Sequence, residues 1–122
     1  QYSSLAILAY AGQAISRKLI KDIGELLLLT SRKMTIGGHP MTVANMPYSM
    51  ASEAGNLLAE RAASWGGTYF DHADGYRQFS LRSVGDFDVS QIAVQVGQQL
   101  GTTGGGHRNA AGFKAPLGWE GE

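Results

Sequence analysis

Apolar residues near the N-terminus recur at spacings of three and four. The positions that follow this spacing are Leu5, Leu8, Gly12, Ile15, Leu19, Ile23 and Leu26. The pattern predicts a long helix from about Leu5 to Leu29 with one apolar face, while charged residues occupy the other faces. The run of four leucines at 26–29 is apolar all round, which suits a segment covered on several sides.

Two hairpins are predicted further along the chain. The first joins residues 34–36 to residues 41–46 through a Gly-Gly-His-Pro turn, and the second joins 68–71 to 76–83 through Asp74-Gly75. Side chains of a strand alternate between its two faces. Phe79 and Leu81 are therefore expected on one face and Gln78, Ser80 and Arg82 on the other, where a ligand could meet Arg82.

Two more helices complete the prediction. One starts at Ser49 or Ser52, runs to about Ser64 and is ended by Gly66-Gly67. The other starts at Asp88, which with Gln91 forms a capping-box-like sequence, and runs to about Val96. A glycine loop follows, with room for a last short strand. The expected fold class is α/β: a single small domain with a mixed β-sheet and packed helices, preceded by a long connector helix.

Composition narrows the function classes. A chain of 122 residues has room for one domain and one core. The formal net charge is zero, and no basic stripe of the kind that grips long nucleic acid is present, so a short or terminal phosphate ligand fits better. There are no cysteines, which excludes disulfides and thiolate metal sites. The longest apolar run is too short to span a bilayer, so no membrane partner is expected.

The start of the sequence suggests a fragment. Gln1 is not a methionine, and the first residues lack the charged opening of a signal peptide. We therefore expect a cut end, a longer parent chain and a cytoplasmic location.

The most informative chemistry lies at Gly104–Phe113, with the sequence Gly-Gly-Gly-His-Arg-Asn-Ala-Ala-Gly-Phe. Three successive glycines leave backbone N–H groups uncovered for a close ligand. His107 can donate to an anionic oxygen and gain charge near neutral pH, and Arg108 adds a fixed positive charge. Together these features predict a phosphate-holding loop.

This string, Gly-Gly-Gly-His-x-x-Ala-Ala-Gly, resembles the signature of the accessory C-terminal domain of the DHH phosphoesterase superfamily. Three further blocks resemble the family in the family's order: Ser-Glu-Ala-Gly-Asn at 52–56, Ser-Leu-Arg-Ser at 80–83 and Asp-Val-Ser-Gln-Ile-Ala at 88–93. One departure is clear. In the family, the helix that begins at the Asp-Val-Ser-x-Ile-Ala block is followed almost directly by four glycines. Here residues 97–103 stand between that helix and the glycines, and three glycines precede His107.

The resemblance implies a substrate-binding half of a metal-dependent phosphoesterase acting on short oligonucleotides, nucleotides or related phosphodiesters. Residues 1–30 would connect it to a missing N-terminal DHH domain, and residues 31–122 would form the DHH-associated domain. Mn²⁺ is implied for that missing domain, while no cofactor is expected on this chain. The implied phosphate-binding residues are Arg82, Ser83, Gly104, Gly105, Gly106, His107 and Arg108. The expected ligand is a nucleotide or a short single strand with a phosphate end.

Two alternatives stay open. The first is a stand-alone nucleotide- or nucleic-acid-binding regulatory module without catalysis. The second is a self-sufficient metal hydrolase using Asp71, His72, Asp74 and His107, although Ala73 stands where the superfamily's Asp-His-His has its second histidine. Because no catalytic cluster is evident, we expect no hydrolysis by the chain alone. The leucine-rich helix also allows a homodimer.

Overall fold

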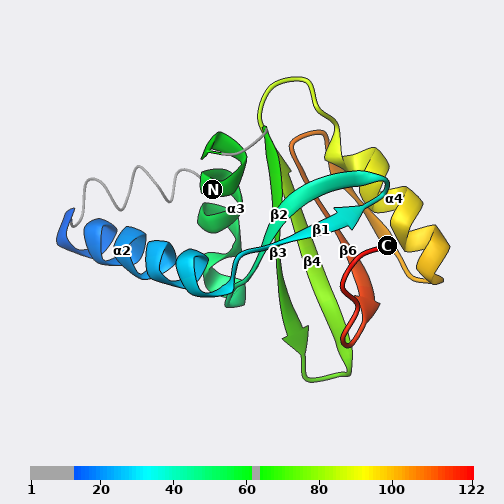
Figure 1. The fold of residues 1–122 in the computed structure, drawn as a ribbon, viewed down its shortest axis with the longest axis horizontal. Helices are drawn as coiled ribbons and strands as arrows, with labels where there is room; N and C mark the ends of the chain where they lie inside the picture. The colour runs from blue at the N-terminus through cyan, green and yellow to red at the C-terminus, as the bar shows by residue number, and fades with distance from the viewer. Residues whose placement is uncertain (1–12, 62–63) are drawn as a thin grey trace.

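A computed structural model describes residues 13–61 and 64–122 (Figure 1). Its strands form one six-stranded sheet in the order β1-β2-β3-β4-β6-β5. The β2–β3 pair is parallel and the other pairs are antiparallel. The elements in chain order are α2 (Gln13–Thr30), β1 (Arg32–Ile36), β2 (His39–Asn45), η1 (Tyr48–Met50), α3 (Ala51–Arg61), β3 (Trp65–His72), β4 (Tyr76–Ser83), α4 (Val89–Leu100), β5 (Gly104–His107) and β6 (Ala110–Pro116).

The sheet separates two apolar clusters, because α2 and α3 lie on one side of it and α4 on the other (Figure 1). The larger cluster joins α4 to the inner residues of five strands, with Phe79, Leu81 and Phe113 at its centre. The smaller cluster joins α2 and α3 to β2 through Ile23 and Leu58. The expected α/β domain with a mixed sheet and an N-terminal helix is confirmed. Within the described ranges, no helix is long and apolar enough to cross a membrane.

The predicted start of α4 at Asp88 is confirmed. Asp88 is the N-cap, and its carboxylate accepts a hydrogen bond from the Ser90 backbone N–H. A hydrogen bond from the Ser90 hydroxyl, assisted by this backbone bond, lowers the pKa of Asp88. The helix runs four residues past the expected end at Val96, to Leu100, and Gly101 closes it in the left-handed conformation with φ 71°.

The prediction that Gly66-Gly67 ends a helix is wrong. α3 ends at Arg61, and β3 begins at Trp65 and continues through both glycines. A Cβ atom added to Gly66 would lie 2.8 Å from the Cβ of Leu58 on α3. The glycine is therefore needed because α3 packs directly against the strand at this point, and not because the chain turns there.

α2 confirms the helical periodicity only for the described part of the predicted helix; Leu5 and Leu8 lie outside the described residues. Ile23 and Leu27 are buried against the domain. Leu28 and Leu29 are 86% and 79% exposed, so the expectation that the four leucines are covered on several sides is wrong for this pair. The helix extends from the sheet as an arm in Figure 1.

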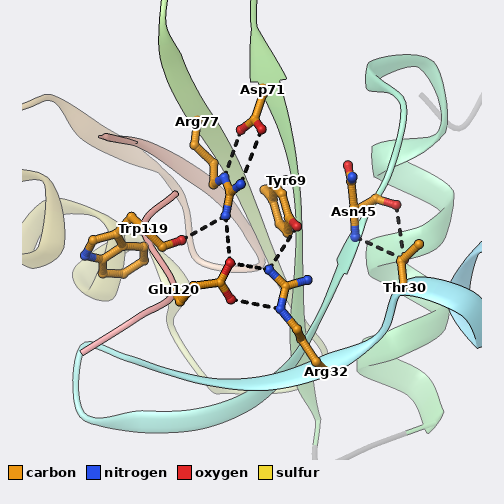
Figure 2. A network of polar contacts seen from close by, with 8 residues as sticks. All are labelled: Thr30, Arg32, Asn45, Tyr69, Asp71, Arg77, Trp119 and Glu120. Carbon is orange, nitrogen blue, oxygen red and sulfur yellow. Dashed lines mark hydrogen bonds and ion pairs between the residues drawn. The ribbon is translucent and has the colours of Figure 1, made fainter. Parts of the chain in front are cut away.

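The C-terminal segment lies across the α4 side of the sheet, where ring contacts and hydrogen bonds hold it (Figure 2). The Trp119 ring meets Phe79 and Phe113 edge-on, with ring centroids 5.3 and 5.6 Å apart. Glu120 accepts hydrogen bonds from Arg32 Nε at 2.8 Å and from Arg77 Nη1 at 3.1 Å. These contacts tie the end of the described chain to β1 and β4.

Neutralising Glu120 is expected to weaken this attachment in a pH-dependent way. Hydrogen bonding from Arg32, assisted by Arg77, holds the pKa of the Glu120 carboxyl below its ordinary value of 4.5. A lowered folded-state pKa stabilises the fold above the ordinary pKa, and this contribution is lost as pH falls through the folded value. Urea unfolding of Glu120→Gln should therefore show lower stability at pH 7 and a smaller further loss between pH 5 and pH 3 than the wild type. The matched control is Glu60→Gln at an exposed position of α3, which should leave the stability nearly unchanged. A Glu120→Gln profile parallel to the wild type throughout would contradict the role of this carboxylate.

Candidate functional site

A cleft of about 1100 Å³ opens on the side of the sheet that carries α2 and α3. Its floor is formed by β3 and β4, and its wall by η1 and the first turn of α3. The lining residues are Leu19, Tyr48, Ser49, Ala51, Ser52, Glu53, Phe70, His72, Tyr76, Gln78, Ser80 and Arg82. The cleft thus combines a helix start, a guanidinium, hydroxyl and amide groups, and aromatic rings.

Alternation along β4 places Arg82 in this cleft. Arg77, Phe79, Leu81 and Ser83 are buried on the α4 side, whereas the intervening Gln78, Ser80 and Arg82 line the cleft. The predicted polar face of this strand is therefore confirmed. It is produced by the two-residue period of the strand acting on an alternating apolar and polar sequence.

Arg82 is held beneath α3 by the absence of a side chain at Gly55. A Cβ atom added to Gly55 would lie 2.5 Å from the Cγ of Arg82. The aliphatic stem of Arg82 is thus in close contact with the helix backbone, which orders the side chain. Gly55 belongs to the Ser-Glu-Ala-Gly-Asn block, and this contact gives that block a physical role in building the site.

The glycine segment is a strand and not a loop. β5 pairs with β6, with Gly105 opposite Gly112 and His107 opposite Ala110. The Lys114 N–H donates to the Thr103 carbonyl, so odd-numbered residues of this segment direct their backbone groups toward β6. By alternation, the N–H groups of Gly104 and Gly106 point to the outer edge of the sheet. The expectation of three amides converging on one phosphate is therefore wrong for this arrangement, because pairing occupies the middle one.

The three glycines of β5 differ in the atoms that lie next to them. A Cβ atom at Gly104 would lie 2.0 Å from the Ala93 carbonyl oxygen of α4. Gly106 has a φ of 147°, and a Cβ there would lie 2.6 Å from the Cα of Ala111. A Cβ at Gly105 would meet nothing within 4 Å. Gly104 therefore serves helix packing, while Gly105 leaves the surface open on the cleft side of the sheet.

Arg82 and His107 lie in one row across the sheet. Arg82 pairs with Ala110 of β6, and Ala110 pairs with His107 of β5. Cross-strand partners point to the same face, so both side chains project from the cleft side. Two strand spacings separate their backbones by about 10 Å. His107 is exposed and lies outside the lining of the cleft itself.

Ser83 and Arg108 are not brought into this row. Ser83 is buried on the opposite face, where its hydroxyl donates to the Phe87 carbonyl at 2.6 Å and accepts from the Asn109 side-chain amide at 2.8 Å. Arg108 lies in the exposed β5–β6 turn, 3.7 Å from the Asp86 carboxylate. Ser83 therefore anchors that turn to β4.

The four residues of the metal alternative do not converge. Asp71 lies on the α4 side and accepts from Arg77, a hydrogen bond that lowers the pKa of the Asp71 carboxyl. His72 faces the cleft, with Asp74 beside it in the turn at 3.6 Å. His107 stands at the other end of the sheet face. Among residues 13–61 and 64–122, no group of three or more histidine and acidic side chains is placed to hold a metal ion.

The Gly55–Arg82 contact, the glycine strand and every cleft-lining residue except Leu19 lie within one family match. Residues 41–120 match the family model of the DHHA1 domain. The chain belongs to the DHHA1 domain family. DHHA1 domains normally accompany a DHH domain and bind nucleic acid or nucleotides. A comparison with curated protein sequences found no match.

The solved structures that share the fold of this DHHA1 domain include the following two. The C-Ala domain of Aquifex aeolicus alanyl-tRNA synthetase matches with a TM-score of 0.52 and 13% identity, over 73% of this chain and 86% of that one. An uncharacterized protein from Helicobacter pylori G27 matches with a TM-score of 0.54 and 23% identity, over 89% of this chain. The match spans 29% of the Helicobacter protein, so this chain is much shorter than that relative.

Several cleft residues were not among the ligand-binding residues predicted from the sequence. Tyr48 and Phe70 form an edge-on ring pair 5.7 Å apart at the cleft, and Ser49 and Ser52 lie at the helix start beside them. The serines predicted at the helix start were a usable signal, because a helix start with two serines offers N–H and hydroxyl groups to an anion. The aromatic residues gave no such signal, because strand aromatics are as often part of a core.

Proposed function

We propose that this DHHA1 domain is the substrate-binding half of a DHH-type phosphoesterase, and that its cleft binds a nucleotide or the phosphate end of a short single strand. The observation that carries the proposal is the position of Arg82, which lies in the cleft opposite the start of α3. A guanidinium can bind two phosphate oxygens at once, and a helix start adds N–H groups that favour an anion. The rings of Tyr48 and Phe70 offer apolar surface to a base.

The wider face beside β4 suits a ligand that extends beyond one phosphate. Gly112 and Gly105 follow Ser80 across the sheet in one row, so the row itself contributes no side-chain group larger than a hydroxyl, although the Gln78 amide lies beside Gly112. The neighbouring row carries His107 and Arg82. A strand leaving the cleft across β6 would meet this smooth surface and an imidazole that can donate to phosphate.

Titration with a nucleoside monophosphate tests the proposal. Because only one side of the ligand is covered by this chain, we expect weak binding, with a Kd in roughly the millimolar to high-micromolar range. In ¹H–¹⁵N NMR spectra, the shifts should concentrate at residues 48–53, at Ser80 and Arg82, and at 105–107. Shifts confined to other surfaces would contradict the proposal.

Hydrolysis would take place, in this proposal, in a DHH domain that supplies the Mn²⁺ ligands. A stand-alone binding module is the second candidate, because the cleft already brings a guanidinium, hydroxyl groups and aromatic rings together. Metal-dependent cleavage of a dinucleotide by the pure chain would contradict both candidates. Restoration of cleavage on adding a separately made DHH domain would favour the first over the second.

A further inference from the structure

Gln78 lies flat on the sheet inside the cleft. Its side-chain nitrogen donates to two backbone carbonyls, Phe79 O at 3.2 Å on β4 and Phe113 O at 3.3 Å on β6. The amide therefore spans the gap between these strands. Gly112 makes room for it, since a Cβ atom at that position would lie 3.3 Å from Gln78 Nε2.

These two bonds fix which end of the amide faces the ligand. A side-chain amide has two N–H donors, and both are committed to backbone carbonyls. Turning the amide around would press Oε1 against the same two carbonyl oxygens, which is unfavourable. Within the described part of the chain, no group donates to Oε1, and this oxygen is not among the buried polar atoms that lack a partner. Oε1 is thus an accessible acceptor held in one orientation.

The position of this acceptor relative to Arg82 sets what it can contact. Gln78 and Arg82 are four residues apart on the same face of β4, about 13 Å along the strand, with Ser80 between them. Phe70 is the cross-strand partner of Gln78. A nucleotide whose phosphate binds at the Arg82 end, and which lies along β4, brings its sugar and base to Gln78 and Phe70.

We infer that Gln78 is a specificity-determining residue that selects ligands with a hydrogen-bond donor, a sugar hydroxyl or a base amine, at this distance from the bound phosphate. The inference rests on the proposed function and refines it. A ligand with only oxygen acceptors, such as inorganic pyrophosphate, gains nothing from Oε1. A nucleotide with a suitable donor pairs with an acceptor that is already held in one orientation. Because no side chain has to be reordered on binding, this one hydrogen bond can discriminate well between ligands.

The test compares four probes on the wild type and on Gln78→Met, which keeps the length of the side chain and removes the acceptor. The probes are AMP, 2′,3′-dideoxyadenosine 5′-monophosphate, purine riboside 5′-monophosphate and inorganic pyrophosphate. We expect Gln78→Met to weaken AMP about tenfold and to leave pyrophosphate within twofold. One of the two AMP analogues lacks the donor that pairs with Gln78. That analogue should bind the wild type about tenfold more weakly than AMP, and its affinity should not change on Gln78→Met. Insensitivity of the dideoxy analogue identifies a sugar hydroxyl, and insensitivity of the purine riboside identifies the amine.

Three results would overturn the inference while leaving the proposed function intact. These are an unchanged AMP affinity in Gln78→Met, an equal loss for AMP and pyrophosphate, and an equal loss for AMP and both analogues. If the variant does not fold, as judged by its NMR dispersion, the wild type alone decides, because equal affinities for AMP and both analogues overturn the inference. Failure of every probe to bind the wild type would instead remove the proposed function, and this inference with it.

Discussion

Gly104→Ala is expected to lower the free energy of unfolding by about 3 kcal/mol or more, a large share of the stability of a small domain. The added Cβ would lie 2.0 Å from the Ala93 carbonyl oxygen and 2.7 Å from the Ala93 carbonyl carbon, so the obstacle is helix backbone and not a mobile side chain. Relief requires α4 to move away from β5, which would expose Ala93 and Val96. Urea unfolding followed by circular dichroism measures the loss.

The adjacent glycine provides the matched control. Gly105→Ala adds the same methyl group to the same strand, where it would meet nothing within 4 Å. Its φ is not in the left-handed region, so the stability should change by no more than about 1 kcal/mol, in either direction. Equal and small effects of both substitutions would show that α4 does not pack on Gly104 as described.

Arg82→Ala is expected to weaken binding of a nucleoside monophosphate by roughly 10- to 150-fold, which corresponds to the loss of a charge-assisted hydrogen bond worth about 1.5–3 kcal/mol. The measurement is the NMR titration described above. Arg82→Lys should recover part of the affinity, because it restores the charge but not the two-oxygen geometry of the guanidinium.

A fold control is needed for Arg82→Ala, because the Arg82 stem packs against Gly55 under α3. Arg82→Met keeps this stem and removes the charge. It should fold with near wild-type stability and bind as weakly as Arg82→Ala. Wild-type affinity in Arg82→Met would show that the guanidinium does not contact the phosphate.

The local patterns were sufficient to predict much of this fold. The Asp74-Gly75 turn, the Asp88 cap and the alternation of β4 each depend on residues close together in the sequence. Two of the wrong assignments involve glycine. At Gly66 and Gly104, glycine is required because a helix from elsewhere in the chain packs directly on the strand. A local sequence pattern contains no information about such a neighbour.

The candidate site was predicted in part for the same reason. Arg82 was expected on an accessible face, and the structure places it there. The sequence could not show that Ser83 turns to the opposite face to hold the β5–β6 turn, or that Gln78 would be pinned across two strands. The Glu120 attachment joins residues 88 positions apart, and nothing local indicates it.

The alternation of β4 also limits where this domain can change in length. The residues that contact a ligand and the residues that fill the core occupy neighbouring positions of one strand, so inserting or deleting a single residue within it would exchange the two sets. Arg82 would then enter the apolar interior, while Phe79 and Leu81 would enter the cleft. Length variation in relatives should therefore be absent from this strand and concentrated at the exposed turn at 73–75, where an added residue shifts neither set.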